Sequence, residues 1–128
     1  MLWGAEWFAT VGAQSSDKGR QALAFLPNEI WIHAGDSITW RFDVDEIHTV
    51  TFILDSATRP PFQAITEFSP TATFDDSTTV STPALVKGVP PVTFSVTFPN
   101  AGNFKLVCLV HENMTGASCP RRFPTTSA

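Results

Sequence analysis

The chain has 128 residues and a formal net charge of −4, and it contains 11 Phe, 4 Trp and no Tyr. This length fits one domain over residues 1–128, which buries about two-thirds of its unfolded surface without disulfides. The negative charge argues against a nucleic-acid partner, and no apolar run is long enough to span a bilayer. We therefore expect a soluble, single-domain protein.

The N-terminal third alternates apolar and polar residues with a period of two, which is typical of half-buried β-strands. Residues 7–13 and 22–25 predict the first two strands, separated by a polar turn. Further strands are predicted over residues 30–34, 38–42 and 49–53.

Residues 55–91 have a different character, because six prolines interrupt a stretch rich in Ser and Thr. Phe62, Ile65, Phe68 and Phe74 are too apolar for a free linker, and long loops in compact domains are often packed by their own side chains. We expect this long connection to fold over one side of the protein, with partner recognition as its alternative role.

The clearest alternation lies in residues 92–98, where every second side chain is Val or Phe. Residues 104–108 continue the pattern, so the Cys108 side chain is predicted to point towards the interior. Several short strands separated by turn residues favour an all-β sandwich.

Three side chains that can bind a metal follow this last strand. Cys108, His111 and Met114 lie within seven residues, and His48 precedes the strand predicted over residues 49–53. Thiolate, imidazole and thioether are soft ligands that select copper over magnesium or calcium. A trigonal His-His-Cys arrangement with a distant axial Met is the ligand field of blue-copper electron-transfer sites.

Each of these residues also has an ordinary explanation. A single Cys or Met in an apolar segment usually fills space in the core. The Cys-x2-His-x2-Met spacing, the upstream His48 and the strand pattern nevertheless agree, and such agreement across levels favours a metal site.

These segments resemble the cupredoxins, the small blue copper proteins of the plastocyanin, pseudoazurin and amicyanin group. The resemblance extends over residues 25–40, 45–50 and 99–108, and the short ligand loop is most similar to that of amicyanin. It implies a Greek-key β-sandwich of two sheets, with paired strands around the turn at Gly35-Asp36.

The resemblance also implies a cofactor, one copper ion per chain held by His48, Cys108, His111 and Met114. The implied function is one-electron transfer, with the copper cycling between Cu(I) and Cu(II). A copper-binding module for delivery or storage, without a carrier role, is the alternative. An enzyme is not expected, because copper enzymes need further His clusters and the chain has 3 His in all.

Redox proteins are the implied partners, docking at an apolar patch around His111 that includes Leu109 and Val110. Thr49 and Glu112 complete the expected surroundings of the metal. The acidic residues near the ligands, which are Asp43, Asp45, Glu46 and Glu112, favour a basic partner. No signal peptide is visible, and the resemblance implies a periplasmic or extracellular location after its removal.

The sequence departs from the cupredoxin pattern at three places. Thr49 replaces the Asn that ties the two ligand loops together in many members, so we expect that tie to be weak or absent. Val107 replaces an aromatic residue that serves a second electron route in plastocyanin. Residues 116–124 lack β-branched alternation and contain two prolines, so the closing strand is predicted to be short, irregular or missing, leaving an irregular C-terminal tail.

Cys119 and His33 remain outside the predicted site. A disulfide would consume the Cys108 thiolate, so we expect Cys119 to be an unpaired thiol at the surface. The protein is then expected to be a monomer, with a Cys119-linked or tail-mediated dimer as the alternative. His33 has no Cys or Met near it in sequence and is also assigned to the surface.

Overall fold

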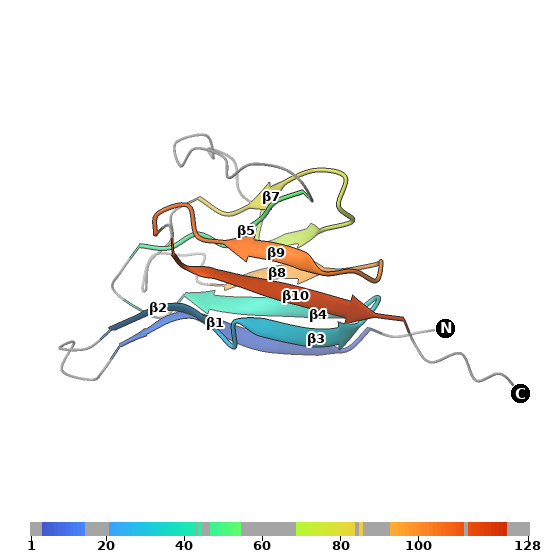
Figure 1. Ribbon diagram of the computed structural model, residues 1–128, viewed down its shortest axis with the longest axis horizontal. Coiled ribbons are helices and arrows are strands. Elements are labelled where there is room, and N and C mark those ends of the chain that lie inside the picture. The colour runs from blue at the N-terminus through green and yellow to red at the C-terminus, as the bar shows by residue number, and fades with distance from the viewer. Residues whose placement is uncertain are drawn as a thin grey trace, which may run out of the picture.

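The computed structural model describes residues 4–14, 21–42, 44, 47–54, 69–83, 85, 93–111 and 113–122. These residues form ten strands in two five-stranded sheets, packed as two layers (Figure 1). The all-β sandwich predicted from the alternation is therefore confirmed. None of the described residues forms a helix with the length and apolar character needed to cross a membrane.

The first sheet has the strand order β2-β1-β4-β8-β6. Its strands are β1 (Glu6–Gln14), β2 (Gln21–Leu26), β4 (Ser37–Phe42), β6 (Thr71–Thr73) and β8 (Thr93–Thr97). β1 pairs antiparallel with β2 and parallel with β4, so the sheet is mixed. The period-two pattern predicted β1, β2, β4 and β8 close to their observed bounds.

The second sheet has the strand order β3-β10-β9-β5-β7. Its strands are β3 (Glu29–His33), β5 (Thr51–Phe52), β7 (Val80–Ser81), β9 (Phe104–Val107) and β10 (Thr115–Arg121). β9 and β10 are antiparallel neighbours joined by a short loop, and β9 also pairs with β5. β5 is shorter than the predicted segment 49–53, because its pairing is limited to two residues.

The turn at Gly35-Asp36 joins strands of different sheets, so the expectation that β3 and β4 pair around it was wrong. β3 lies beside β10 in the second sheet, and β4 lies between β1 and β8 in the first. Alternation shows which residues face the core but does not identify the neighbouring strand. The chain crosses between the sheets here, as it does between β4 and β5.

Aromatic side chains from both sheets fill the space between the layers. Phe52 of β5 lies with its ring centroid 5.3 Å from that of Trp40 in β4 and 5.2 Å from that of Phe98. Phe104 stacks on Phe98, with the ring planes 12° apart. Because tilted and offset aromatic pairs contribute beyond the area they bury, this cluster is a major source of cohesion between the sheets.

The described part of the long connection between β5 and β8 contributes a strand to each sheet. β6 pairs with β8 in the first sheet, and β7 pairs with β5 in the second. Phe74 is fully buried against Phe52 and Phe104, as packing of this segment predicted. Phe62, Ile65 and Phe68 lie outside the described residues.

The predicted irregular C-terminal segment is a regular strand, so that expectation was wrong. β10 pairs parallel with β3 and antiparallel with β9. Pro120 lies opposite Gly102, which precedes the start of β9 at Phe104, and its carbonyl accepts a hydrogen bond from Gly102 N–H at 3.0 Å. Proline has no N–H to offer on this side, and Gly102 O accepts instead from the Arg121 guanidinium at 3.2 Å. Residues 123–128 lie outside the described part.

Cys119 is 2% exposed, so the expected surface thiol is in fact a buried one. Burial and the nearby Glu29 carboxylate, whose Oε1 lies 3.9 Å from the sulfur, raise the pKa of this thiol. A disulfide between two chains needs an accessible thiolate, so this position argues against a Cys119-linked dimer.

The Asp36 carboxylate fixes the crossing from β3 to β4. It accepts hydrogen bonds from the Ala5 N–H at 2.7 Å, the Trp7 indole N–H at 2.9 Å and the His33 N–H at 3.0 Å. Burial alone would raise the pKa of Asp36, but these hydrogen bonds outweigh it and hold the pKa below its ordinary value. The carboxylate is therefore more stable in the folded chain than in the unfolded one.

Asp36→Asn is expected to lower the free energy of unfolding at pH 7 by about 1–3 kcal/mol, because an amide cannot accept all three bonds. The carboxylate contribution is fully present above the unfolded pKa of about 3.9 and is lost as pH falls through the lower folded pKa. Urea unfolding at pH 7 and in acid should show the difference between variant and parent shrinking in acid.

The control is Asp75→Asn, which removes an exposed carboxylate bonded to Ser77 in its own turn and should change stability much less. Equal losses in the two variants would contradict the structural role of Asp36.

Candidate metal centre

His48 lies on the connection that carries the chain from β4 in the first sheet to β5 in the second. Its backbone N–H donates to Leu85 O at 3.1 Å, and its carbonyl accepts from Leu85 N–H at 2.9 Å. The residue is 1% exposed. Two backbone hydrogen bonds and nearly complete burial therefore fix the position of the imidazole.

Gly12 of β1 lies directly against this imidazole. A Cβ atom placed on Gly12 would lie 2.7 Å from His48 Nε2, which is closer than packing allows. The glycine also has a φ of +76° at an irregularity in the β1–β2 pairing. A glycine inside a strand marks a bulge or a close approach, so Gly12 in the predicted strand 7–13 was the signal for a contact that the sequence reasoning missed.

Cys108, His111 and Met114 lie in the loop that joins β9 to β10 (Figure 1). Cys108 N–H donates to Met114 O at 3.0 Å, and Met114 N–H donates to His111 O at 3.1 Å. These bonds close the loop on itself and return Met114 to the level of Cys108. Cys108 and Met114 are buried, as the inward direction predicted for Cys108 requires, whereas His111 is half-buried.

The two histidines converge on the cysteine sulfur. His48 Nδ1 lies 3.9 Å and His111 Nδ1 lies 3.7 Å from Cys108 Sγ, and the ligand atoms of the three residues all lie within 4.8 Å of one another. A first-row metal at about 2.0 Å from nitrogen and about 2.3 Å from sulfur, with bond angles near about 120°, separates those atoms by about 3.7 Å. The triangle therefore has the dimensions of a trigonal metal site.

The chemistry of the four side chains fits copper. Two imidazole nitrogens, one thiolate and a thioether in the same loop are the ligands of a type 1 site, and copper(II) binds such ligands more tightly than other divalent first-row metals. His48, Cys108, His111 and Met114 are thus positioned for a copper site.

Thr49 ties the two ligand-bearing segments together, contrary to the weak or absent tie that was expected. Its backbone N–H donates to Cys108 Sγ at 3.4 Å, and its Oγ1 accepts from Leu109 N–H at 2.8 Å. A threonine hydroxyl has the acceptor that this geometry needs, so it can take the place of an asparagine side chain. A hydrogen bond to the sulfur also stabilises the thiolate and tunes a metal bound to it.

The apolar surroundings differ from the expected patch around His111. Leu109 is 6% exposed and packs with Ile53 and Val107 below the surface. Val110 is 36% exposed, and Ile47, next to His48 in the chain, is 45% exposed. The acidic residues Asp43, Asp45, Glu46 and Glu112 lie outside the described residues, and His33 is exposed on β3 as predicted.

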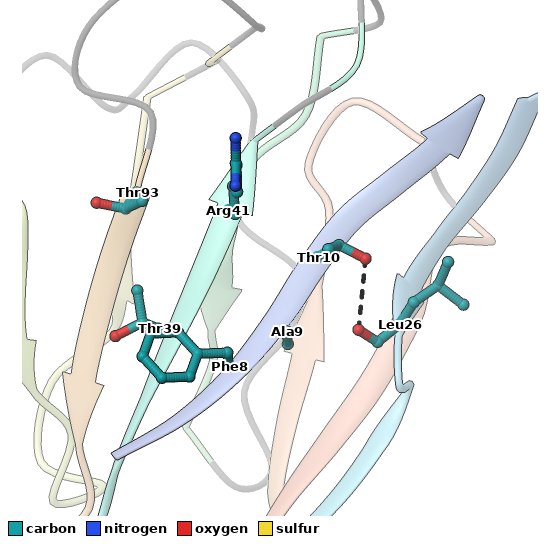
Figure 2. A pocket seen from close by; sticks show the side chains of 7 residues that line it. All are labelled: Phe8, Ala9, Thr10, Leu26, Thr39, Arg41 and Thr93. Carbon is teal, nitrogen blue, oxygen red and sulfur yellow. Dashed lines mark hydrogen bonds between the residues drawn. The ribbon is translucent and has the colours of Figure 1, made fainter. Parts of the chain in front are cut away.

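A separate pocket of about 560 Å³ lies on the outer face of the first sheet. Figure 2 shows Phe8, Thr10, Leu26 and Arg41 around it, on β1, β2 and β4. Among the described residues that line it there is no His, Cys or Met, and none of the four candidate ligands, so this pocket is separate from the metal site.

No protein-family model matches the chain, and no curated protein matches its sequence. Its fold, in contrast, matches solved structures of amicyanin. The Cu(I) form of a methionine-to-glutamine variant of amicyanin has a TM-score of 0.60 and 15% identity, covering 91% of this chain and 83% of that chain. The oxidized form of a methionine-to-lysine variant has a TM-score of 0.61 and 16% identity, covering 91% and 82%.

A third amicyanin structure, the Cu(I) form at pH 4 of a proline-to-glycine variant, has a TM-score of 0.59 and 17% identity, covering 94% of this chain and 86% of that one. At such low identity the likeness shows the fold alone. The chain has the cupredoxin fold, as its resemblance to that group implied.

Gly12→Ala is expected to weaken Cu(II) binding by about 10–100-fold, because the new methyl group displaces His48 from the sulfur. Competition titration with a chelator of known affinity measures this loss.

Gly35→Ala is the matched control. Gly35 also has positive φ, +99°, but a Cβ there has no neighbour within 4 Å, so the backbone strain is reproduced without the contact. A loss of affinity that is equal in both variants would show that strain, and not the His48 contact, is responsible.

Proposed function

We propose that the protein is a one-electron carrier with a single type 1 copper held by His48, Cys108, His111 and Met114. The observation that supports this most directly is the convergence of the two Nδ1 atoms on Cys108 Sγ at 3.9 and 3.7 Å. When bound, copper supplies the Cu(I)/Cu(II) couple. The protein supplies ligands that are held in place independently of the metal.

The rigidity of these ligands is what electron transfer requires. A carrier works fast when its site rearranges little between oxidation states, and hydrogen bonds that orient the ligands limit such rearrangement. Backbone bonds to Leu85 fix His48, and the Thr49 bonds fix the sulfur and the start of the loop. Burial of Cys108 and His48 also keeps water away from the metal position.

Electrons are proposed to enter and leave through His111. It is half-buried, whereas His48 is almost fully enclosed. The exposed Val110 and Ile47 offer apolar contacts on the same two segments. A small apolar surface of this kind suits the brief encounters of redox proteins, whose interfaces are at the small end of the range.

Copper delivery or storage is the competing function, and the burial of the ligands argues against it. A delivery protein must pass its metal to another set of ligands, which requires accessible donors. Here Cys108 is fully buried and His48 is 1% exposed. We also propose that the protein is not an enzyme, because 3 His in the sequence leave no second copper cluster. A periplasmic or extracellular location and a monomeric state complete the proposal.

The decisive experiment is the absorption spectrum after addition of Cu(II). We expect an intense visible band from charge transfer between the Cys108 thiolate and copper, and reversible loss of that band on one-electron reduction. Cys108→Ser should abolish the band, whereas Cys119→Ala should preserve it. A colourless protein that binds Cu(I) tightly would instead identify a delivery or storage module.

Met114→Gln is expected to lower the reduction potential, because a harder oxygen ligand in the axial position favours Cu(II). Cyclic voltammetry of the variant and the parent measures the shift. An unchanged midpoint would exclude an axial role for Met114.

A further inference from the structure

A row of hydroxyl groups runs from the ligand loop to the edge strand β7. Leu109 N–H donates to Thr49 Oγ1 at 2.8 Å, and Thr49 Oγ1 lies 3.0 Å from Thr51 Oγ1. Thr51 Oγ1 lies 2.7 Å from Ser81 Oγ, which in turn donates to Thr82 O at 2.9 Å. These contacts connect the site to a strand that carries no candidate ligand.

The carbonyl at the end of this row can accept but cannot donate, which favours one direction for the hydrogen bonds along it. Each hydroxyl has one proton, and that of Ser81 is used by Thr82 O. With the Ser81 proton on Thr82 O, Ser81 Oγ accepts from Thr51 and Thr51 Oγ1 accepts from Thr49. The proton of Thr49 thus points away from the ligand loop, which leaves the oxygen lone pairs facing Leu109 N–H.

The burial of the row makes this ordering consequential. Thr49 is 1% exposed, and Thr51 and Thr82 are fully buried. In a low-dielectric interior, aligned hydrogen bonds polarise one another, so Thr49 becomes a stronger acceptor when Thr51 accepts its proton. Two hydrogen bonds with Val50 hold Thr82 in place. Thr82 N–H donates to Val50 O at 3.0 Å, and Thr82 Oγ1 accepts from Val50 N–H at 3.1 Å. The Thr82 carbonyl, which is the last acceptor of the row, is therefore held in a fixed position.

We propose that Thr51 and Ser81 are positioning residues for the copper site, acting through Thr49 on the Cys108-Leu109 segment. By holding the Thr49 hydroxyl in one orientation, they keep Leu109 N–H bonded and the sulfur at a fixed distance from the two imidazoles. This role rests on the proposed copper function. The ordering of the loop, however, belongs to the chain itself and can be measured without metal.

The test compares Thr51→Val with Thr51→Ser. Valine keeps the shape but removes the hydroxyl, so in the metal-free protein the Leu109 amide should exchange with solvent about tenfold faster or more, relative to amides of β8. Thr51→Ser restores a hydroxyl and should return the rate to that of the parent. In the copper-loaded protein, Thr51→Val should shift the visible band and speed copper loss about tenfold.

Thr39→Val is the matched control. Thr39 Oγ1 lies 2.6 Å from Ser95 Oγ in the first sheet, so this variant also removes the hydroxyl of a buried threonine that contacts a serine hydroxyl, but away from the ligand loop. It should leave both the relative exchange rate of Leu109 and the visible band unchanged. If Thr51→Val does not fold, Ser81→Ala replaces it, because Ser81 is only half-buried. The Leu109 amide of that variant should likewise exchange faster than in the parent.

Two results would overturn the proposal. One is a Leu109 amide that is equally protected in Thr51→Val and in the parent. The other is a Leu109 amide that exchanges faster in Thr51→Val and equally fast in Thr51→Ser, which would mean that packing and not the hydroxyl is responsible. A Leu109 amide that responds as expected in a chain that never binds copper would uphold the hydroxyl row and reject the carrier function.

Discussion

The arrangement of the site depends on two hydrogen bonds made by one residue, Thr49. Its N–H donates to Cys108 Sγ and its Oγ1 accepts from Leu109 N–H. One partner lies on the crossing between the sheets and the other on the β9–β10 loop, so these bonds join segments sixty positions apart. Since a buried donor left without an acceptor costs about 1–3 kcal/mol, the two segments favour one relative position. The distances from His48 to the ligands of the loop depend on that position.

The alternation of residues predicted most strands and the inward direction of Cys108, because burial on one face leaves a period-two pattern in the sequence. The same pattern could not show that Gly35-Asp36 joins different sheets, since facing the core says nothing about which strand lies alongside. The expectation that Pro120 interrupts the closing strand was wrong for a related reason. A proline excludes a strand position only where a neighbour needs its N–H, and β9 begins at Phe104, short of that level.

The four candidate ligands could be identified from spacing and donor type, whereas the parts that hold them could not. Gly12 lies thirty-six positions before His48, and its contact with the imidazole is at an irregularity in the β1–β2 pairing. Because Thr49 replaces an asparagine, the tie between the two ligand-bearing segments was expected to be weak or absent. The tie needs only an acceptor oxygen and a backbone N–H, however, and Thr49 has both. Long-range contacts of this kind produce no periodic pattern in the sequence. The glycine inside the predicted strand was the one local feature that indicated such a contact.

The unequal burial of the two histidines has a consequence for how the proposed electron carrier would meet other proteins. His48 is sealed behind Gly12 and Leu85, and only His111 comes near the surface among the described ligands. A metal centre with one ligand near the surface cannot contact an electron donor and an electron acceptor at the same time. In the proposed function the electron donor and the acceptor would therefore bind one after the other, and an excess of either would inhibit electron transfer by competing for the same surface.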